Sequence, residues 1–108
     1  MQKTIVRYKL KPGYAEENIR LVKAVYSQIA LEKPGDFRYT TYQLEDGVSF
    51  LHIAIHDGDG KSPISGFSAF QEFQKDIKTR CAELPVVTQA TEIGSYQSDP
   101  ATKEYQPL

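Results

Sequence analysis

The dipeptide Asp46-Gly47 is the feature that most restricts how this chain can fold. Asp-Gly is a strong signal for the two-residue loop of a β-hairpin, because both central residues of a type I′ turn need a positive φ angle. The flanking segments 37–44 and 48–56 are rich in aromatic and β-branched residues, which favour strands. The sequence therefore predicts two antiparallel strands joined by a tight loop at Asp46-Gly47.

The position of this loop also determines which residues lie opposite each other in the hairpin. Thr41 is expected opposite His52, and Phe37 opposite His56. One face is then largely aliphatic, and we expect it in the core; it carries Tyr42, Leu44, Leu51, Ile53 and Ile55. The other face mixes aromatic and polar groups, as a cavity wall or a subunit interface would; it carries Phe37, Tyr39, Thr41, Gln43, Phe50, His52, Ala54 and His56.

Hydrophobic periodicity predicts the elements on both sides of the hairpin. Residues 3–11 alternate with a period of two, which predicts a strand. Residues 15–33 have apolar side chains at helical spacing and are followed by Pro34-Gly35, so they predict an amphipathic helix that ends there. A second helix is predicted from about residue 67 to 82, and a final strand from 86 to 93.

The predicted order, β-α-β-β-α-β, is that of a ferredoxin-like α+β domain. Its four strands form one antiparallel sheet with two helices on one face. The chain of 108 residues has room for one such domain, at 1–96. We expect the polar C-terminal tail, 97–108, to be disordered or packed on a partner subunit. Because two helices cover one face only, we expect a homodimer in which two copies pair as a dimeric α/β barrel.

Composition argues against several classes of function. The formal net charge is −1, from 13 basic and 14 acidic residues that are well mixed, so we expect neither a nucleic-acid partner nor a membrane partner. Neither a signal peptide nor a bilayer-spanning stretch is apparent. Cys81 is the single cysteine, which excludes an intrachain disulfide and fits a reducing compartment. We therefore expect a cytoplasmic protein.

An RNA-binding domain has the same order of elements and is an alternative to be tested against its motif. The segment 46–53 matches the third-strand motif at Gly47, Ser49, Phe50 and Leu51, but lacks the basic residue and two aromatic residues. This mismatch and the negative net charge argue against RNA binding.

His52 is the candidate catalytic residue, because the pKa of an imidazole lies near neutrality and a single His can transfer protons. Structural burial of His52 is the alternative. His52 and His56 are not expected to share a metal ion. Four residues of strand span about 13 Å, whereas zinc ligands lie about 2 Å from the ion.

Candidate substrate-binding residues lie on the mixed face of the hairpin or on the second predicted helix. Helical spacing of aromatic residues is typical of a core and equally of an apolar pocket, so both interpretations stay open. No glycine-rich phosphate loop and no metal-ligand motif is present, so we expect no cofactor and no metal. The candidates are Tyr39, Phe50, Phe70, Phe73 and His56.

Several strings of residues resemble the dimeric α/β-barrel superfamily, near the antibiotic-biosynthesis-monooxygenase-like proteins. The resemblance covers about residues 3–96 and implies two sheets packed into a barrel at a dimer interface, with a ligand cleft in each subunit between sheet and helices. The strings are Lys11-Pro12-Gly13 before a long helix, a strand finishing at His56-Asp57, the helical segment Phe70-Gln71-Glu72-Phe73, and the terminal strand 87–96.

The resemblance implies several possible activities. Some members oxidise polycyclic phenols without metal or flavin, whereas others degrade haem, isomerise lactones or have no known activity. This chain has no Trp, and its second predicted helix has no His. Members that use a Trp for quinone or haem chemistry, and haem-degrading members with a His on that helix, are therefore poor guides.

Two hypotheses of function follow from the residues and the resemblance. The first is a cofactor-independent monooxygenase-like enzyme that acts on a small aromatic substrate, with His52 as a possible proton acceptor. The second is a non-catalytic dimeric protein that binds a small apolar or aromatic ligand or has a structural role. The second is favoured by the absence of a recognisable nucleophile–base pair.

Overall fold

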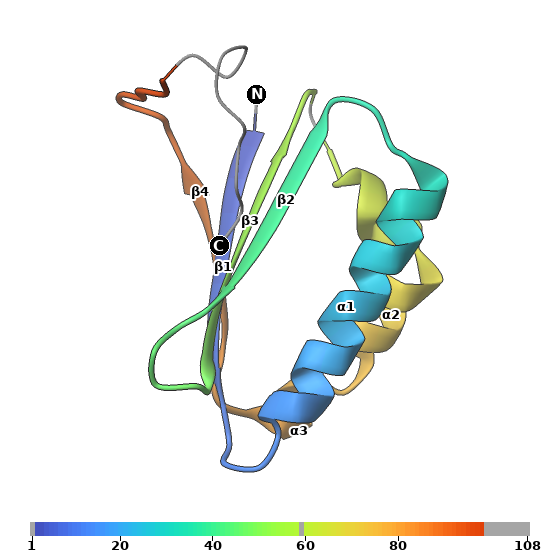
Figure 1. Ribbon diagram of the computed structural model, residues 1–108, viewed down its shortest axis with the longest axis vertical. Helices are drawn as coiled ribbons and strands as arrows, with labels where there is room; N and C mark the ends of the chain where they lie inside the picture. The colour runs from blue at the N-terminus through green and yellow to red at the C-terminus, as the bar shows by residue number, and fades with distance from the viewer. Residues whose placement is uncertain (1, 59, 99–108) are drawn as a thin grey trace.

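The computed structural model describes residues 2–58 and 60–98, which form one sheet covered by helices on one face (Figure 1). The four strands are antiparallel and follow the order β2-β3-β1-β4. This arrangement confirms the predicted ferredoxin-like α+β fold. The elements are β1 (Gln2–Leu10), α1 (Ala15–Glu32), β2 (Phe37–Gln43), β3 (Ser49–His56), the short 3₁₀ helix η1 (Pro63–Gly66), α2 (Ser68–Lys75), α3 (Ile77–Arg80) and β4 (Cys81–Ala90).

The register of the hairpin is as predicted, but its loop is not. Thr41 pairs with His52 and Phe37 with His56. The predicted two-residue type I′ loop is wrong, because Gly47 has a positive φ of 78° and Asp46 does not. The Asp46 carboxylate instead accepts hydrogen bonds from the backbone N–H groups of Val48 and Ser49, so the side chain organises a longer loop with the same register.

The mixed face of the hairpin points toward the helices. Phe50, His52 and His56 are buried there, whereas Tyr42 on the aliphatic face is half exposed. The expectation that the aliphatic face forms the core is therefore wrong for a single chain. The reason lies in β1: Tyr8 is buried beneath the helices and pairs with Phe50, so alternation along β3 places the aliphatic residues on the open face.

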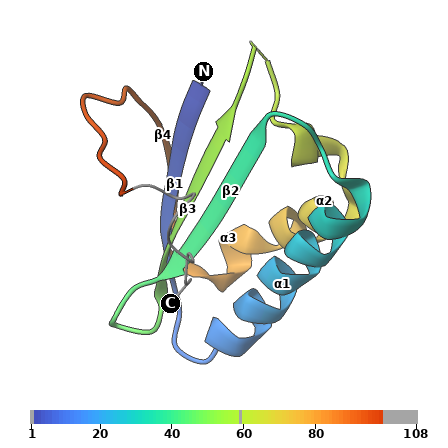
Figure 2. The ribbon, with the colours of Figure 1, turned by 45° about the horizontal axis from the view of Figure 1, so that its top comes forward.

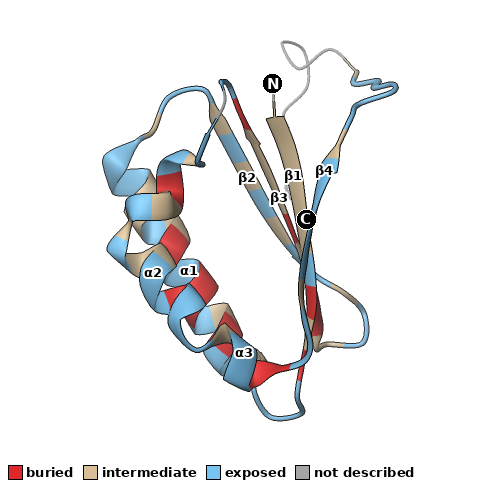
Figure 3. Ribbon diagram, turned by 180° about the vertical axis from the view of Figure 1, so that it is seen from behind, coloured by how far each residue is buried: buried red, intermediate tan, exposed pale blue. Residues whose placement is uncertain are grey.

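Helix α1 ends within one residue of its predicted boundary. Lys33 adopts the left-handed conformation with φ 49°, and its N–H donates to the carbonyl of Ile29, as in a left-handed helix cap. The buried side of α1 is turned toward the sheet (Figure 3). It includes a polar residue, Asn18, whose exposed fraction is 0%, in addition to Leu21, Val22 and Val25.

The predicted C-terminal end of the second helix is wrong. Helix α2 stops at Lys75, a single turn (α3) follows, and β4 begins at Cys81, where a helix was expected (Figure 2). The buried Arg80 side chain explains this break, because its Nη2 donates to the carbonyl of Phe73 at 2.7 Å and thereby satisfies a terminal carbonyl of α2. Pro85 is tolerated in β4 because β4 is an edge strand, where a missing N–H leaves no unpaired carbonyl in the sheet.

The final strand also ends earlier than predicted, at Ala90. Ile93 and Tyr96 follow it and are 92% and 91% exposed. Of the tail expected at 97–108, residues 99–108 lie outside the described residues. No helix in the described part of the chain is both long and apolar enough to cross a membrane.

Candidate functional site

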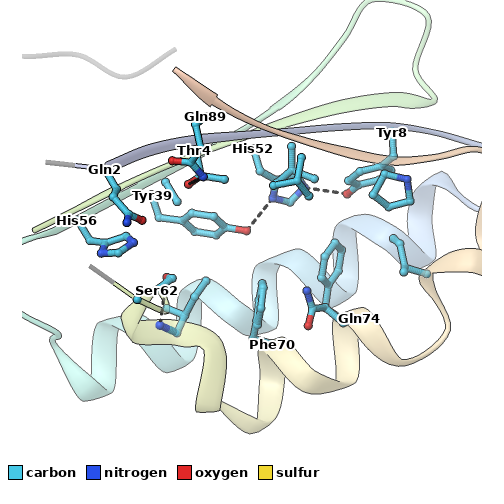
Figure 4. A pocket seen from close by; sticks show the side chains of 18 residues that line it. Gln2, Thr4, Tyr8, Tyr39, His52, His56, Ser62, Phe70, Gln74 and Gln89 are labelled. Atoms are coloured by element: carbon cyan, nitrogen blue, oxygen red, sulfur yellow. Dashed lines mark hydrogen bonds between the residues drawn. The ribbon is translucent and has the colours of Figure 1, made fainter. Parts of the chain in front are cut away.

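A cavity of about 310 Å³ lies between the sheet and the second helical segment (Figure 4). All four strands contribute inward-facing residues to it, and the loop after β3 and helices α2 and α3 close the other side. The lining residues are Gln2, Thr4, Val6, Tyr8, Tyr39, His52, Ala54, His56, Gly60, Ser62, Ile64, Phe70, Phe73, Gln74, Ile77, Pro85, Val87 and Gln89.

The described lining of this cavity contains no Lys, Arg, Asp or Glu. Phe70 and Phe73 form part of an apolar wall, and their rings stack with centroids 6.2 Å apart. Polar groups are amides, hydroxyls and imidazoles. Such a lining favours an uncharged, mainly apolar ligand, because an unpaired charge would lose its hydration there without compensation.

His52 is held by hydroxyl groups on both sides of its ring. Its Nε2 lies 2.8 Å from the hydroxyl oxygen of Tyr8, and its Nδ1 lies 2.7 Å from that of Tyr39 (Figure 4). The hydroxyl of Thr41 is a second neighbour of Nδ1, at 3.2 Å. The residues come from β1, β2 and β3, so the sheet itself brings them together.

This group extends from the sheet into helix α1. Asn18 Nδ2 donates to the Tyr8 hydroxyl at 2.9 Å, and the Thr41 hydroxyl is 2.9 Å from that of Tyr26. The amide oxygen of Asn18 is buried without a hydrogen-bond partner in the described structure. The imidazole is thus surrounded by a network that ties α1 to three strands.

Burial changes the proton affinity of these groups. It lowers the pKa of His52 to about 4, because the charged imidazolium is disfavoured away from water. Burial also raises the pKa values of Tyr8 and Tyr39 well above the ordinary tyrosine range. At neutral pH the network is therefore uncharged, with a neutral imidazole and protonated phenols.

The structure brings most of the predicted site residues to the cavity. His52, Tyr39, Phe70 and Phe73 line it, and so does His56, whose Nδ1 lies 3.1 Å from the carbonyl oxygen of Asp57. Phe50 does not line it. Its ring stacks on Tyr8 at a centroid distance of 5.7 Å, and it is buried in the core. The functional roles of these residues stay predictions.

Sequence reasoning missed Asn18 and did not assign a site role to Tyr8. Asn18 falls three residues after Ala15 and four before Val22, both of which belong to the predicted apolar stripe of the helix. A polar residue inside such a stripe signals a buried hydrogen-bonding partner. Tyr8 lies on the inward side of β1 and carries the corresponding hydroxyl.

The described residues show no cluster of three or more His, Cys, Asp or Glu side chains suited to hold a metal ion. The two histidines on β3 are both buried. They contact different partners: His52 the tyrosine hydroxyls and His56 the carbonyl of Asp57.

Comparison with solved structures finds the same architecture in several bacterial proteins. One is provisionally named as an antibiotic biosynthesis monooxygenase from Bacteroides thetaiotaomicron, with a TM-score of 0.73 and 14% identity over 91% of this chain and 94% of that chain. Another, of the same provisional name, is from Nitrosomonas europaea, with a TM-score of 0.69 and 16% identity over 85% and 89%. A third structure, of a protein from Pseudomonas aeruginosa, has a TM-score of 0.68 and 18% identity over 86% of this chain and 94% of that chain.

No family model matches the chain, and no curated protein matches it either. At these low identities the likeness to solved structures establishes the fold and does not assign an activity. The chain has the fold of the antibiotic-biosynthesis-monooxygenase-like proteins, which the sequence resemblance predicted.

Proposed function

We propose that this protein binds a small, neutral aromatic molecule in the cavity between sheet and helices and oxygenates it with dioxygen and no cofactor. The observation that carries the proposal is an uncharged, largely apolar cavity with the Tyr39 hydroxyl and His52 on its wall. The names of the solved structures with this fold agree with an oxygenase.

The size of the cavity supports a ligand of about two rings. An engineered apolar cavity of about 150 Å³ holds one benzene molecule, and this cavity has about 310 Å³. Phe70 and Phe73 offer ring surfaces for stacking, and the amides of Gln2, Gln74 and Gln89 offer hydrogen bonds.

The proposed reaction needs no external reductant. The CH₂ group of an anthrone, or of the keto tautomer of a phenol, reacts with one dioxygen molecule to give a carbonyl group and one water, so atoms and electrons balance. Carbon is oxidised as dioxygen is reduced. The role of the protein is to exclude water, orient the ring and stabilise negative charge that develops on the oxygen of the substrate. Tyr39 is the residue that we expect to touch that oxygen.

Non-catalytic binding is the second candidate, and a specific observation favours it. Both ring nitrogens of His52 lie at hydrogen-bonding distance from protein hydroxyls, and its pKa is lowered to about 4. The imidazole is therefore a weak proton acceptor, and the hydroxyls of Tyr8, Tyr39 and Thr41 occupy the positions next to its two ring nitrogens. A protein that only binds its ligand needs no such acceptor.

We also propose that two copies pair through the open face of the sheet. Leu84 and Val86 of β4 are 55% and 63% exposed on this face, and Tyr42 of β2 is 51% exposed. A hollow on the same face is lined by Ile5 and Leu51 among others. An apolar sheet face of this kind favours a partner, and a second copy supplies a self-complementary one.

Oxygen consumption with a panel of anthrones, naphthols and hydroquinones tests the enzymatic proposal. We expect turnover by the natural protein and a drop of at least tenfold in kcat/KM for Tyr39→Phe. Tyr42→Phe, the same change on the open face of the same strand, is the matched control and should keep its activity. Saturable binding of these compounds without oxygen uptake would favour the non-catalytic candidate, and absence of binding would contradict both.

A further inference from the structure

Four buried side chains form one continuous hydrogen-bonded chain that ends at the cavity. It runs from Asn18 to Tyr8, to His52 and to Tyr39, with separations of 2.9, 2.8 and 2.7 Å. Each hydroxyl has one hydrogen to donate, and a neutral imidazole has one N–H and one accepting nitrogen. If the Tyr8 hydrogen is donated within the chain, the donor at one end determines the direction of every other bond in it.

The direction can be worked out from the helix end. Asn18 Nδ2 donates to the Tyr8 oxygen, so the Tyr8 hydrogen is free to be donated onward. Tyr8 is buried, so its hydrogen needs an acceptor, and His52 Nε2 at 2.8 Å offers one when that nitrogen is unprotonated. A neutral imidazole that accepts at Nε2 carries its hydrogen at Nδ1.

The surroundings of Nδ1 independently favour the same tautomer. Two hydroxyl oxygens lie near this nitrogen, Tyr39 at 2.7 Å and Thr41 at 3.2 Å. One N–H can be shared between two acceptors in a three-centre bond. An unprotonated Nδ1 has a single lone pair in the ring plane and cannot accept well from both. The contacts of Nε2 and the contacts of Nδ1 therefore indicate the same tautomer of His52.

We propose that Asn18 is a positioning residue that holds His52 as the Nδ1–H tautomer, so that Tyr39 accepts from His52 and turns its own hydroxyl hydrogen to the cavity. The Tyr39 hydroxyl lies 2.7 Å from His52 Nδ1, interacts with the side chain of Thr41 as well, and lies on the wall of the cavity. With the Tyr39 hydrogen directed to the cavity, the ligand must offer an acceptor, such as the carbonyl oxygen of an aromatic ketone or quinone. This inference rests on the proposed function in so far as it assumes that the cavity binds a small molecule.

The direction of the Tyr39 hydrogen bond also determines how the site would act on a bound oxygen. A hydroxyl that donates into the cavity stabilises negative charge on a bound oxygen, as an oxyanion-stabilising group does. His52 then supports Tyr39 and does not take the proton of the substrate. The proton of a phenolic substrate has to leave toward another group or toward solvent.

The tautomer of His52 can be tested without any ligand. Long-range proton–nitrogen correlation spectra of the nitrogen-labelled protein distinguish a protonated ring nitrogen from an unprotonated one. We expect a protonated Nδ1 and an unprotonated Nε2 in His52 at neutral pH. The opposite pattern would overturn the proposal, because it would require Tyr39 to donate to His52 and Asn18 to present its oxygen to Tyr8.

The ligand half of the proposal is tested with three bicyclic probes of nearly the same shape. 1-Indanone has a carbonyl acceptor, indene has no polar group, and indole has an N–H donor. One hydrogen bond contributes about 1 kcal/mol, so we expect 1-indanone to bind about fivefold more tightly than indene and indole to bind no better than indene. NMR titration measures the three dissociation constants and confirms that the shifted resonances lie at the cavity.

The outcomes separate this inference from the proposed function. Equal affinities for the three probes, or a preference for indole, would overturn the predicted direction while a binding cavity stands. Absence of binding by all three at the cavity would overturn the proposed function together with the ligand half of the inference. The role of Asn18 is in that case decided by the tautomer alone.

Two variants complete the test. In Tyr39→Phe the ratio of 1-indanone to indene affinity should fall to about one. In Asn18→Leu the donor that orders the chain is gone, so we expect a mixture of His52 tautomers and a smaller ratio. A ratio of affinities cancels any change that affects all probes alike. An Asn18→Leu protein that is folded and retains the pure Nδ1–H tautomer would show that Asn18 has no positioning role.

Discussion

Tyr39 lies diagonally across from His52 on the neighbouring strand, and its hydroxyl oxygen approaches Nδ1 of the imidazole to 2.7 Å. The residue directly paired with Tyr39 is Ala54, which is small enough to leave the side chain room to lean toward His52. The tyrosine covers the imidazole and helps to separate it from water. Because of this burial His52 has a pKa of about 4.

The depressed pKa of His52 predicts a loss of stability in mild acid. A His that is neutral in the fold stabilises it fully above the unfolded pKa of about 6.5, and this contribution is lost as the pH falls toward about 4. We expect the free energy of unfolding to drop by about 2–3 kcal/mol between about pH 7 and pH 4.5. Urea unfolding at several pH values measures it.

His52→Gln is the control for this pH dependence. The variant should be less stable than the natural protein at neutral pH, because it loses ring contacts, but its stability should vary much less across the same range. Asp46 also has a lowered pKa, caused by hydrogen bonds from Ser49 and Val48, but its contribution is lost below its unfolded pKa of about 4. If the stability of His52→Gln varied with pH as steeply as that of the natural protein, His52 would not be the source of the pH dependence.

The hairpin shows which features of the fold can be predicted from local sequence. Its register follows from the position of the loop and the period of two, and both are visible in the sequence. The type of turn could not be predicted in this way. The Asp46 carboxylate accepts hydrogen bonds from the backbone N–H groups of Val48 and Ser49, and Asp46 therefore needs no positive φ angle. Side-chain chemistry overrode the dipeptide preference.

The remaining errors concern contacts between distant segments. The alternation in β3 predicted two faces, but which one the helices cover depends on the pairing of Phe50 with Tyr8. The break at the end of α2 depends on Arg80 reaching back to Phe73. The site residues that share one hairpin, such as Tyr39 and His52, could be predicted from the sequence. Asn18 was missed, because only the packing of α1 on the sheet brings it close to the other site residues.

Gln28 of α1 acts as the cap of α2, and its loss should destabilise the protein. Its Oε1 accepts a hydrogen bond from the backbone N–H of Ala69 at 2.9 Å, in the first turn of α2. We expect Gln28→Ala to lower the free energy of unfolding by about 1 kcal/mol, as the loss of an N-cap does. Gln71→Ala, at an exposed site of α2, is the control and should change it by less than about 0.5 kcal/mol.

Cys81 should react slowly with thiol reagents in the folded protein. It is 5% exposed, and burial raises its pKa, so little thiolate is available at neutral pH. We expect labelling by a chromogenic disulfide to be at least tenfold slower in buffer than in denaturing urea. Because the chain has one cysteine, the absorbance reports this site alone. Equally fast labelling in both conditions would show that the first residues of β4 open readily.

Val86 offers the sharpest test of pairing through the open face of the sheet. It is 63% exposed at the edge strand and adjoins the hollow that Ile5 and Leu51 also line. In the proposed interface a Lys at this position would place an unpaired charge against the apolar face of the partner, which costs far more than the lost contact. We expect light scattering to give twice 12.2 kDa for the natural protein and 12.2 kDa for Val86→Lys.

Leu31→Lys is the control for this test. Leu31 is a helix residue that is 82% exposed and far from the open face, so this variant should stay dimeric. A monomeric natural protein would contradict the proposed pairing, and a dimer that survives Val86→Lys would place the interface elsewhere.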